Sequence, residues 1–566
     1  MLVLRDYSAK FDALASKRLF PVLVFLISLA YLLLGCNRDI NFYDEGLVVY
    51  GASRTLDGDV PCRDFWTIYP PGQFYLLALV FKVFGTSLMV GRILSTLTNA
   101  TIVLCVYLLS RSLLPWRHAL FSSFLILVWL AELPMYTSAL TTALLFSLVS
   151  CLCLLHGLET RTGTWTLLAG FLAGIATLFR HDIGFYTFLS QSAVTIPFTY
   201  AHLCQTQRTK VTRLVASLKT YSMLFAGVMI VLLPAGIALT AAVGAKELFV
   251  NLILFPAVVF PEFRASPYPL PCPNPLLLLS GEMPLGRFVR KTIELVPFYL
   301  PVVFLVIAAQ LVLSVLRERS FSSKSWVTLL LLLLGVTFLN YARVRSDLWH
   351  LSAALVPAVI LLTSALYACS KNRTSKRRSF LHNLTIVILV MTLISFGRTF
   401  VRVTGRKLCI SSSTNRLASV DIGRARGIKV SRDKAEPLVK AVEYVRSVTD
   451  CDEKIFVGNH RHDIIPAADV MFYFLAERDS ATKYYELHPG LATTEAVQTH
   501  IVDDLRTSIV RYIVLVNRWE HFEPSNKANE SSGITLLDNF IESNYTEVIS
   551  FGPYRILRIN GLRPDV

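Results

Sequence analysis

The sequence is poor in charged residues for a protein of 566 residues. Lys, Arg, Asp and Glu make up 17% of the chain, whereas hydrophobic residues make up 54%. Soluble proteins carry about 25% charged residues, so this composition excludes an ordinary soluble globular protein. It indicates instead a polytopic membrane protein.

Paired metal-binding or redox cysteines are also lacking, because no two of the ten cysteines form a CxxC pair. A zinc ribbon or a thioredoxin-like site is therefore disfavoured. The first apolar run has no clear small-residue cleavage site, so we expect a retained helix rather than a cleaved signal. A disulfide on the outer side stays open, with Cys36, Cys62, Cys272, Cys409 and Cys451 as candidates.

The chain shows no internal repeat, and charged residues are nearly absent from the middle of its apolar runs, where Arg92 is the clearest case. Transporters typically place ionisable residues within their spans and are often built from repeated halves. These two absences disfavour a transporter or lipid flippase and leave it as the alternative.

Excess positive charge is absent from the C-terminal part. Residues 1–397 hold 32 Lys and Arg against 17 Asp and Glu, whereas residues 398–566, called the tail from here on, hold 23 against 22. A nearly neutral tail offers no basic stripe for a phosphate backbone, so we expect no nucleic-acid partner.

Long apolar runs dominate what the sequence does contain. A membrane-spanning helix needs about 20 apolar residues, and about eleven runs of residues 1–397 approach this length. They lie near residues 19–36, 88–110, 118–134, 138–157, 164–180, 183–201, 220–242, 297–316, 325–341, 349–369 and 380–397. The apolar run Gln73–Phe84 is shorter, so we expect an interfacial or re-entrant helix there.

The charges between the runs predict the orientation. Lys and Arg collect at the N-terminus and in alternate loops, which the positive-inside rule places in the cytoplasm. Loop 37–72, the long loop 243–296 and the tail then lie outside. The Pro-rich stretch 261–275 of the long loop is expected to be irregular.

The tail alternates helical and strand patterns, which predicts a small α/β domain. We expect helices near residues 435–448, 467–476 and 494–505, and strands near 454–457, 512–516 and 555–559. The expected fold is therefore a polytopic α-helical membrane domain, residues 1–397, followed by an extracytoplasmic α/β domain, residues 398–566.

The first outer loop, residues 37–72, is acidic and much longer than a plain connector. Asp44 and Glu45 stand there between the apolar stretches NFY and GLVVYGA. A carboxylate at a membrane interface can act as a general base on a bound hydroxyl. The plainer alternative is a solvated acidic loop.

Arginines on the outer side run against the usual charge bias of membrane proteins. Arg54 and Arg63, the latter followed by Asp64, lie in the first outer loop. An anionic lipid head group would explain them, because a guanidinium binds phosphate through two parallel hydrogen bonds. Ordinary surface charge or a local ion pair is the alternative.

Two further outer turns collect ionisable residues between apolar runs. The first is Arg180-His181-Asp182, which suggests a site lining a cavity, or else a polar turn with Asp182 as a helix cap. The second is a candidate phosphate clamp or an interfacial anchor, and it contains Arg343, Arg345, Asp347 and His350.

The stretch YGASRTLDGDVPCRDFWTIYPPGQFYLLALVFKVFG, which follows Asp44-Glu45, resembles the GT-C superfamily. Within it, the chain is similar to the protein O-mannosyltransferase and aminoarabinose transferase group, the family 39-like glycosyltransferases. The resemblance implies an inverting sugar transfer from a polyprenyl-phosphate donor on the outer face, with Asp44 as general base and Glu45 as its catalytic neighbour.

The resemblance and the charge pattern together predict the remaining site residues. Donor phosphate ligands are expected among Arg54, Arg63, Arg180, Arg343 and Arg345. Substrate-binding residues are expected among Asp64, Tyr69, His181, Asp182, Asp347 and His350.

A divalent metal remains open, because some GT-C enzymes use one and others do not. The acceptor is a glycan, lipid or protein. The tail resembles bacterial members, so we expect a bacterial inner membrane with the N-terminus in the cytoplasm and the tail in the periplasm. An assembly subunit of a polysaccharide machine is a further alternative to the enzyme.

Overall fold

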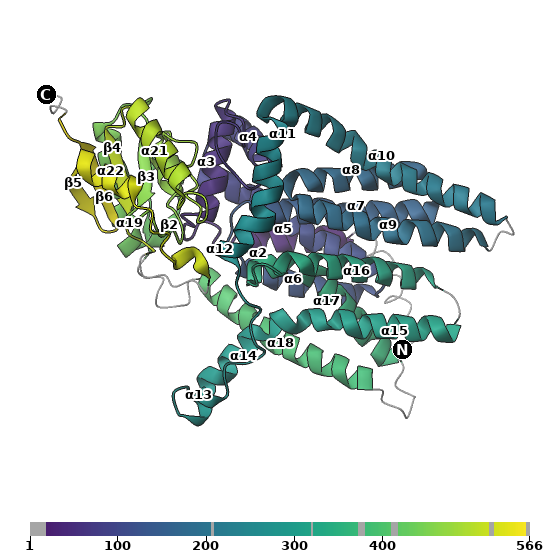
Figure 1. Ribbon diagram of the computed structural model, residues 1–566. Helices are drawn as coiled ribbons and strands as arrows, with labels where there is room; N and C mark the ends of the chain where they lie inside the picture. Colours follow the sequence, from purple (N-terminus) through teal and green to yellow (C-terminus); the bar gives the residue numbers. More distant parts are fainter. Residues whose placement is uncertain are drawn as a thin grey trace.

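The chain forms a bundle of long helices with a mixed α/β tail at one end (Figure 1). A computed structural model describes residues 19–204, 209–318, 321–371, 380–408, 417–519 and 526–561. The basic N-terminal residues used to predict the orientation, Arg5, Lys10, Lys17 and Arg18, lie outside these ranges, as does Cys409.

Each predicted apolar run coincides with a helix. These helices are α2 (Phe20–Leu33), α5 (Leu88–Arg111), α6 (Trp116–Glu132), α7 (Ala139–Thr160), α8 (Gly163–Phe179), α9 (His181–Cys204), α10 (Lys210–Val243), α15 (Val303–Glu318), α16 (Ser323–Leu339), α17 (Leu348–Lys371) and α18 (Phe380–Lys407). By length and composition, seven helical stretches of the described residues can cross a membrane, and α2 and α8 are shorter apolar helices.

Two of the loops that the charge pattern predicts to be cytoplasmic lie at the same end of the helix bundle. Figure 1 shows the turn between α7 and α8, and the ends where α15 leads to α16, at the side of the bundle away from the tail. Arg161 lies in the first of these turns and Lys324 begins α16. The positive charge of these turns and the tail therefore lie at opposite ends of the helices.

The first outer loop is folded into two helices, α3 (Asp44–Leu56) and α4 (Gly72–Phe84). α3 begins where the Asn41 side-chain oxygen accepts hydrogen bonds from the backbone N–H groups of Tyr43 and Asp44, at 3.1 and 2.9 Å. Two acidic residues in its first turn suit the positive end of the helix dipole. α4 has 13 residues and is one of the shorter apolar helices.

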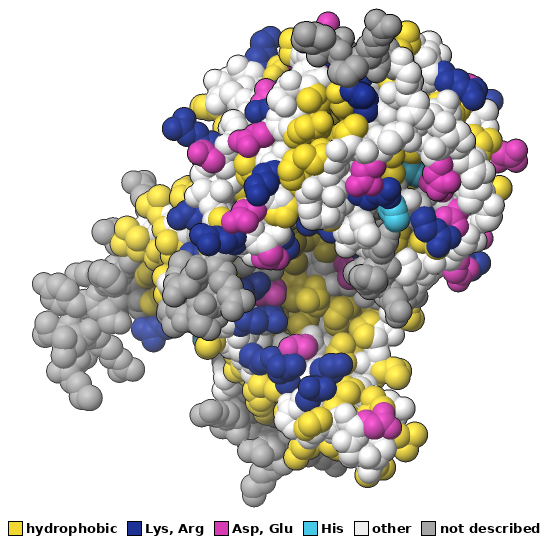
Figure 2. All heavy atoms as spheres, turned by 90° about the vertical axis from the view of Figure 1, so that its left-hand side faces the viewer, with side chains coloured by type: hydrophobic (Ala, Val, Ile, Leu, Met, Phe, Trp, Pro, Cys, Tyr) yellow, Lys and Arg dark blue, Asp and Glu magenta, His cyan; other side chains and the backbone are white. Residues whose placement is uncertain are grey.

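The long outer loop is mostly helical. It contains α11 (Ala245–Phe249), a π-helix (Val250–Val259), α12 (Phe260–Arg264), α13 (Leu276–Leu279) and α14 (Leu285–Tyr299). The predicted irregular stretch is irregular from residue 265 to 275, whereas its first residues belong to α12. Seen from the side of the tail, Lys and Arg side chains gather among hydrophobic ones on the lobe below the tail (Figure 2).

The tail is built on a four-stranded mixed sheet with the order β3-β4-β6-β5. Its strands are β3 (Phe456–Asn459), β4 (Tyr512–Val516), β5 (Tyr545–Phe551) and β6 (Tyr554–Ile559). β3 and β4 are parallel, and the other two pairs are antiparallel. A small antiparallel pair, β1 (Leu417–Ser419) and β2 (Lys429–Ser431), precedes it.

The helices of the tail are α19 (Arg432–Val448), α20 (Met471–Ala476), α21 (Glu495–Thr507) and α22 (Leu536–Asn544). The first three match predicted helices. β5 and α22 were not predicted. β5 exposes most of its residues and carries Thr, Glu and Ser, so its hydrophobic pattern is weak.

The first outer loop and the tail share one hydrophobic core. Phe42, Leu47 and Tyr50 belong to the same cluster of buried side chains as Met471 and Tyr473. Four backbone hydrogen bonds cross between the two parts: Asp39 N to Lys429 O, Lys429 N to Asn37 O, Met471 N to Phe42 O and Trp66 N to Lys483 O. Helix α18 crosses the predicted boundary at residue 397 and ends at Lys407. The division of the chain into two domains at that boundary stays a prediction.

Candidate active site

A cavity lies where the first outer loop, the α8–α9 junction, α12, the turn before α17 and the tail meet. Its polar lining residues are Asp44, Gln73, Ser138, Arg180, Arg264, Arg345, Asp347, His350, Glu486 and His488. Its aromatic lining residues are Tyr43, Phe74, Tyr69, Tyr136, Phe260, Tyr341 and Trp349. Acidic and basic side chains from five separate parts of the chain therefore meet in one space with largely aromatic walls.

Asp44 faces this cavity from the first turn of α3. The Asn41 side-chain amide donates to Asp44 Oδ2 at 3.0 Å and fixes the carboxylate. No ion pair to Asp44 is found among the described residues, so its charge is balanced by the helix end and by this hydrogen bond. Such a carboxylate can accept a proton from a bound hydroxyl.

Glu45, the next residue, points away into the protein. It forms a two-point ion pair with Arg92, with N–O distances of 2.7 and 2.8 Å. Both side chains are buried, and Arg92 also donates to the carbonyl oxygens of Cys36 and Asp39 at 2.9 and 2.6 Å. This arrangement ties the first outer loop to α5, and a catalytic part for Glu45 stays a prediction.

Two of the cavity arginines already have carboxylate partners. Arg180 pairs with Asp182 at 2.8 Å, and its guanidinium lies over the ring of Tyr341, 4.6 Å from the centroid. Arg345 pairs with Asp347 at 2.9 Å.

Asp347 also binds the ring of His350, with 2.7 Å between Oδ1 and Nδ1. Asp182 thus binds Arg180 but does not line the cavity. Asp347 and His350 both line the cavity.

Arg264 is different because it is buried without a carboxylate partner among the described residues. Its side chain is 6% exposed, and its Nη1 donates to the carbonyl oxygen of Pro466 in the tail at 2.6 Å. Its Nη2 is buried and has no hydrogen-bond partner among the described atoms. A buried guanidinium with an unused N–H group is suited to bind an anion in the cavity.

The tail contributes Glu486 and His488 to the cavity wall. Tyr43 Oη donates to Glu486 Oε1 at 3.1 Å. Burial raises the pKa of Glu486 to about 8, although Tyr43 and Arg264 act in the opposite direction. Burial also disfavours the charged form of His488, and it lowers the pKa of this histidine well below its usual value, so His488 is neutral. Phe255, whose ring centroid lies 5.2 Å away, contributes to the apolar surroundings of His488.

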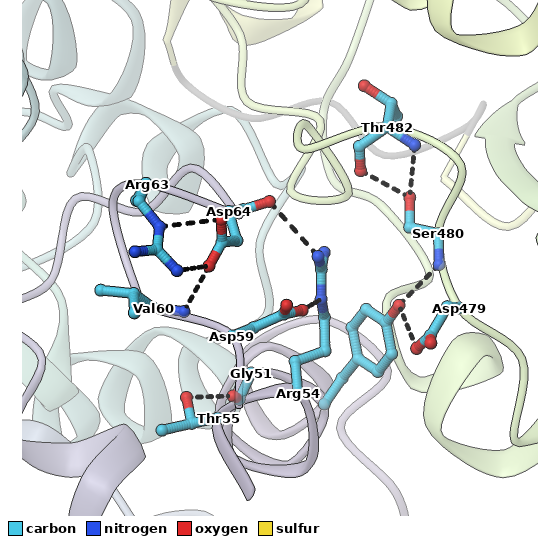
Figure 3. Close-up of polar contacts among 11 residues, drawn as sticks. Gly51, Arg54, Thr55, Asp59, Val60, Arg63, Asp64, Asp479, Ser480 and Thr482 are labelled. Atoms are coloured by element: carbon cyan, nitrogen blue, oxygen red, sulfur yellow. Dashed lines mark hydrogen bonds and ion pairs between the residues drawn. The ribbon is translucent and has the colours of Figure 1, made fainter. Parts of the chain in front are cut away.

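Arg54 and Arg63, predicted to bind the donor phosphate, and Asp64, predicted to bind substrate, contact one another and do not line the cavity (Figure 3). Arg54 pairs with Asp59 at 2.6 Å and donates to the Asp64 carbonyl oxygen at 3.3 Å. Arg63 pairs with the Asp64 side chain at 2.8 Å. Tyr50, on the same helix as Arg54, accepts a hydrogen bond of 2.7 Å from the backbone of Ser480. The arginine contacts therefore stabilise the first outer loop itself, and the Tyr50 hydrogen bond links this loop to the tail.

Of the other predicted residues, Tyr69 lines the cavity, whereas His181 and Arg343 do not line it. His181 is half-buried next to Arg180, and Arg343 is exposed. The structure therefore brings together six predicted residues, namely Asp44, Tyr69, Arg180, Arg345, Asp347 and His350.

Sequence reasoning did not select Arg264, Glu486 or His488 for the site. Arg264 is one of several charged residues of the long outer loop. Glu486 and His488 belong to a polar cluster of the tail, YYELHPG, and nothing in the sequence indicates that this segment packs against α3. Their role follows from long-range packing, which local patterns do not encode.

A metal site is not evident in the part of the chain that the structure describes. No group of three or more His, Cys, Asp and Glu side chains there is arranged to hold a metal ion. Cys36, Cys62, Cys272 and Cys451 are free thiols. Among the described residues, these four thiols therefore form no disulfide.

Comparison with known proteins gives a family for part of the chain. Residues 69–234 match the family model of dolichyl-phosphate-mannose-protein mannosyltransferases. This segment begins at a cavity residue, Tyr69, and includes another, Arg180. No curated protein matches the sequence.

Solved structures give the fold. ArnT from Cupriavidus metallidurans, bound to undecaprenyl phosphate, is 12% identical with a TM-score of 0.52, over 98% of this chain and 100% of that one. The archaeal oligosaccharyltransferase AglB from Archaeoglobus fulgidus, in complex with an inhibitory peptide and a dolichol-phosphate, is 13% identical with a TM-score of 0.47. The match covers 97% of this chain and 75% of that one.

These findings confirm the predicted fold class, a multi-pass membrane protein with a mixed α/β tail. They also confirm, at the level of family and fold, the prediction of a polyprenyl-phosphate-sugar-dependent glycosyltransferase. Residues 69–234 thus match the protein-mannosyltransferase family model, and the chain as a whole has a fold similar to that of ArnT.

Proposed function

We propose that this chain moves a sugar from a polyprenyl-phosphate donor to an acceptor hydroxyl, with inversion, on the outer face of the membrane. One observation carries the proposal: Asp44 lines the same cavity as three arginines. A base for the acceptor and cations for the leaving phosphate are the two groups that this reaction requires.

In the proposed reaction, Asp44 takes the proton of the acceptor hydroxyl. The acceptor oxygen then forms a bond to the anomeric carbon from the side opposite the phosphate, and the bond from that carbon to the phosphate oxygen breaks. Arg264, Arg180 and Arg345 stabilise the negative charge that develops on the departing polyprenyl phosphate, since charge-assisted hydrogen bonds are strong in a water-poor site.

The orientation of the donor follows from the two ends of the bundle. The tail and the first outer loop line the cavity. Figure 1 shows the tail at one end of the helices and the α7–α8 and α15–α16 turns at the other, where Arg161 and Lys324 lie. By the positive-inside rule, the basic end is cytoplasmic and the cavity opens on the outer side. We propose a bacterial inner membrane, with undecaprenyl phosphate as the lipid carrier, which is the lipid bound to ArnT.

The test is sugar transfer by purified protein in detergent. A panel of labelled polyprenyl-monophosphate sugars is offered with a membrane extract as acceptor, and the wild type is compared with Asp44→Asn. Asp57→Asn is the matched control, because Asp57 ends the same helix but is exposed and outside the cavity.

We expect transfer by the wild type and by Asp57→Asn, and a loss of at least about a hundredfold in Asp44→Asn, the range typical of a missing general base. Retained transfer in a folded Asp44→Asn protein would contradict the assignment of the base. If vesicles containing the protein instead moved the lipid-linked sugar across the membrane without transfer, the chain would be a flippase.

A further inference from the structure

Glu486 is a buried acid in the cavity that the reaction above does not use. Its side chain is 2% exposed and lines the same space as Asp44. It comes from the tail, whereas Asp44 and its neighbour Tyr43 come from the first outer loop. The hydrogen bond from Tyr43 Oη, at 3.1 Å, holds one carboxyl oxygen of Glu486 beside Asp44.

The second carboxyl oxygen of Glu486 has no hydrogen-bond partner among the described residues, and no Lys or Arg of those residues forms an ion pair with Glu486. A buried carboxylate without a paired cation is unstable, so the group takes up a proton. The protonated form has an O–H group available to donate, and Glu486 lines the cavity.

We infer that Glu486 is an acceptor-positioning residue, which donates a hydrogen bond from its neutral carboxyl group to an oxygen of an uncharged, hydroxyl-bearing acceptor and so turns the reacting hydroxyl toward Asp44. This inference rests on the proposed function. Glu486 keeps its proton throughout, while the proton of the acceptor goes to Asp44.

The electrostatic setting agrees with a neutral Glu486. An ionised Glu486 would repel Asp44 and would compete with the donor phosphate for Arg264. The charged and titratable groups that face it from the surrounding elements are Tyr43, Asp44, Tyr69, Arg264, Tyr485 and His488.

Among these groups, Glu486 is the one expected to titrate in the weakly alkaline range. Burial raises the pKa of each of the three tyrosines and lowers that of His488 well below its usual value, whereas the pKa of Glu486 is raised to about 8. The neutral form of Glu486, and with it the acceptor contact, is therefore present below about pH 8 and lost above it.

The activity test compares three proteins at several pH values: the wild type, Glu486→Gln and Glu486→Ala. Transfer is measured with the labelled polyprenyl-phosphate sugar and the membrane extract. Wild-type transfer should fall as the pH rises through about 8, whereas Glu486→Gln, which keeps an N–H donor without a titrating proton, should retain transfer and lose this alkaline fall.

Glu486→Ala should need about tenfold more extract for half-maximal rate, the size expected for one lost hydrogen bond, with an unchanged KM for the donor. Glu495→Gln, an exposed glutamate that begins α21, is the control. A folded Glu486→Gln protein that is as impaired as the alanine variant, or that keeps the alkaline fall, would overturn the inference.

A second measurement needs no donor and separates this inference from the proposed function. Because the folded state holds the proton of Glu486 more tightly than the unfolded chain, stability of the wild type relative to Glu486→Gln should decrease from about pH 4.5 to about pH 8. Thermal unfolding in detergent measures it. A pH-independent difference would show that Glu486 is not held neutral, whatever the outcome with Asp44→Asn.

Discussion

The three arginines of the cavity differ in what else they bind. Arg180 and Arg345 each form an ion pair with a carboxylate of their own, at 2.8 and 2.9 Å. The ion pair neutralises part of the charge of each arginine and fixes the direction of its side chain. Arg264 donates to a carbonyl oxygen and keeps Nη2 without a protein partner among the described residues. Of the three arginines, Arg264 is therefore expected to bind a phosphate most strongly, because no carboxylate among the described residues pairs with its guanidinium.

This difference gives a prediction for two arginines of the outer side. Arg264→Met should raise the KM for the donor by about tenfold or more, because a hydrogen bond to a charged group contributes about 1.5–3 kcal/mol. Arg343→Met should leave it unchanged, because Arg343 is exposed and outside the cavity. Initial rates against donor concentration measure both, with thermal unfolding as the check on folding. Equal effects of the two variants would contradict the phosphate assignment to Arg264.

Single residues also show where sequence reasoning is limited. Asp44 and Glu45 are adjacent and both acidic, and the sequence groups them as one motif. Successive residues on a helix point about 100° apart, so one faces the cavity and the other the Arg92 guanidinium. The sequence identified the acidic pair but not the helix that begins there, and the ion pair of Glu45 depends on α5, far along the chain.

At the scale of elements, the placement of Asp44 depends on how closely α3 approaches the tail. Gly46, one turn into α3, has no side chain, and a Cβ atom there would lie 2.5 Å from the backbone nitrogen of Met471 at the start of α20. Tyr50, one turn further along α3, stacks on Tyr473 of α20 with 5.1 Å between ring centroids. The two helices are thus in direct backbone contact next to the cavity.

Gly46→Ala should therefore separate α3 from α20 and displace Asp44. Overpacking of this kind costs about 1–3 kcal/mol, and we expect a lower Tm together with reduced transfer. Gly236→Ala is the matched control, because a Cβ at Gly236, inside α10, would meet nothing within 4 Å. Alanine in a helix interior is favourable by about 0.5–1 kcal/mol, so this variant should be at least as stable as the wild type. A Gly46→Ala protein with unchanged Tm and activity would show that the contact is not tight.

Elements with strong local signals were predictable, and those defined by packing were not. Each apolar run predicted a helix, because about 20 apolar residues have no other stable state in lipid, whereas α14, in the predicted long outer loop, was not predicted. In contrast, α3 has a mixed composition and gains its stability from the tail, and the π-helix before α12 has no distinct sequence pattern. Arg264, which closes α12, could therefore not be placed in advance.

At the scale of the whole molecule, the tail forms part of the wall of the cavity. Phe42, Leu47 and Tyr50 of the first outer loop are buried in the core of the tail, and Arg264 of the long outer loop reaches the Pro466 carbonyl oxygen. Glu486 then enters the cavity from the tail. The alternating helix and strand patterns predicted a small α/β domain for the tail, but local patterns do not report which surfaces pack together.

This arrangement predicts that the tail stays in place without its covalent connection. A protease site is introduced between residues 409 and 416, a segment outside the described residues that joins α18 to the tail. After cleavage, the tail should co-elute with the membrane part in detergent and transfer should persist. Each of the three buried side chains contributes about 1.5–3 kcal/mol, in addition to the four backbone hydrogen bonds that link the two parts. The uncut protein and a protein without the site, treated with the same protease, are the controls. If the cleaved tail separated and transfer persisted, the tail would not form part of the active site, and the roles of Glu486 and the shared core would both be wrong.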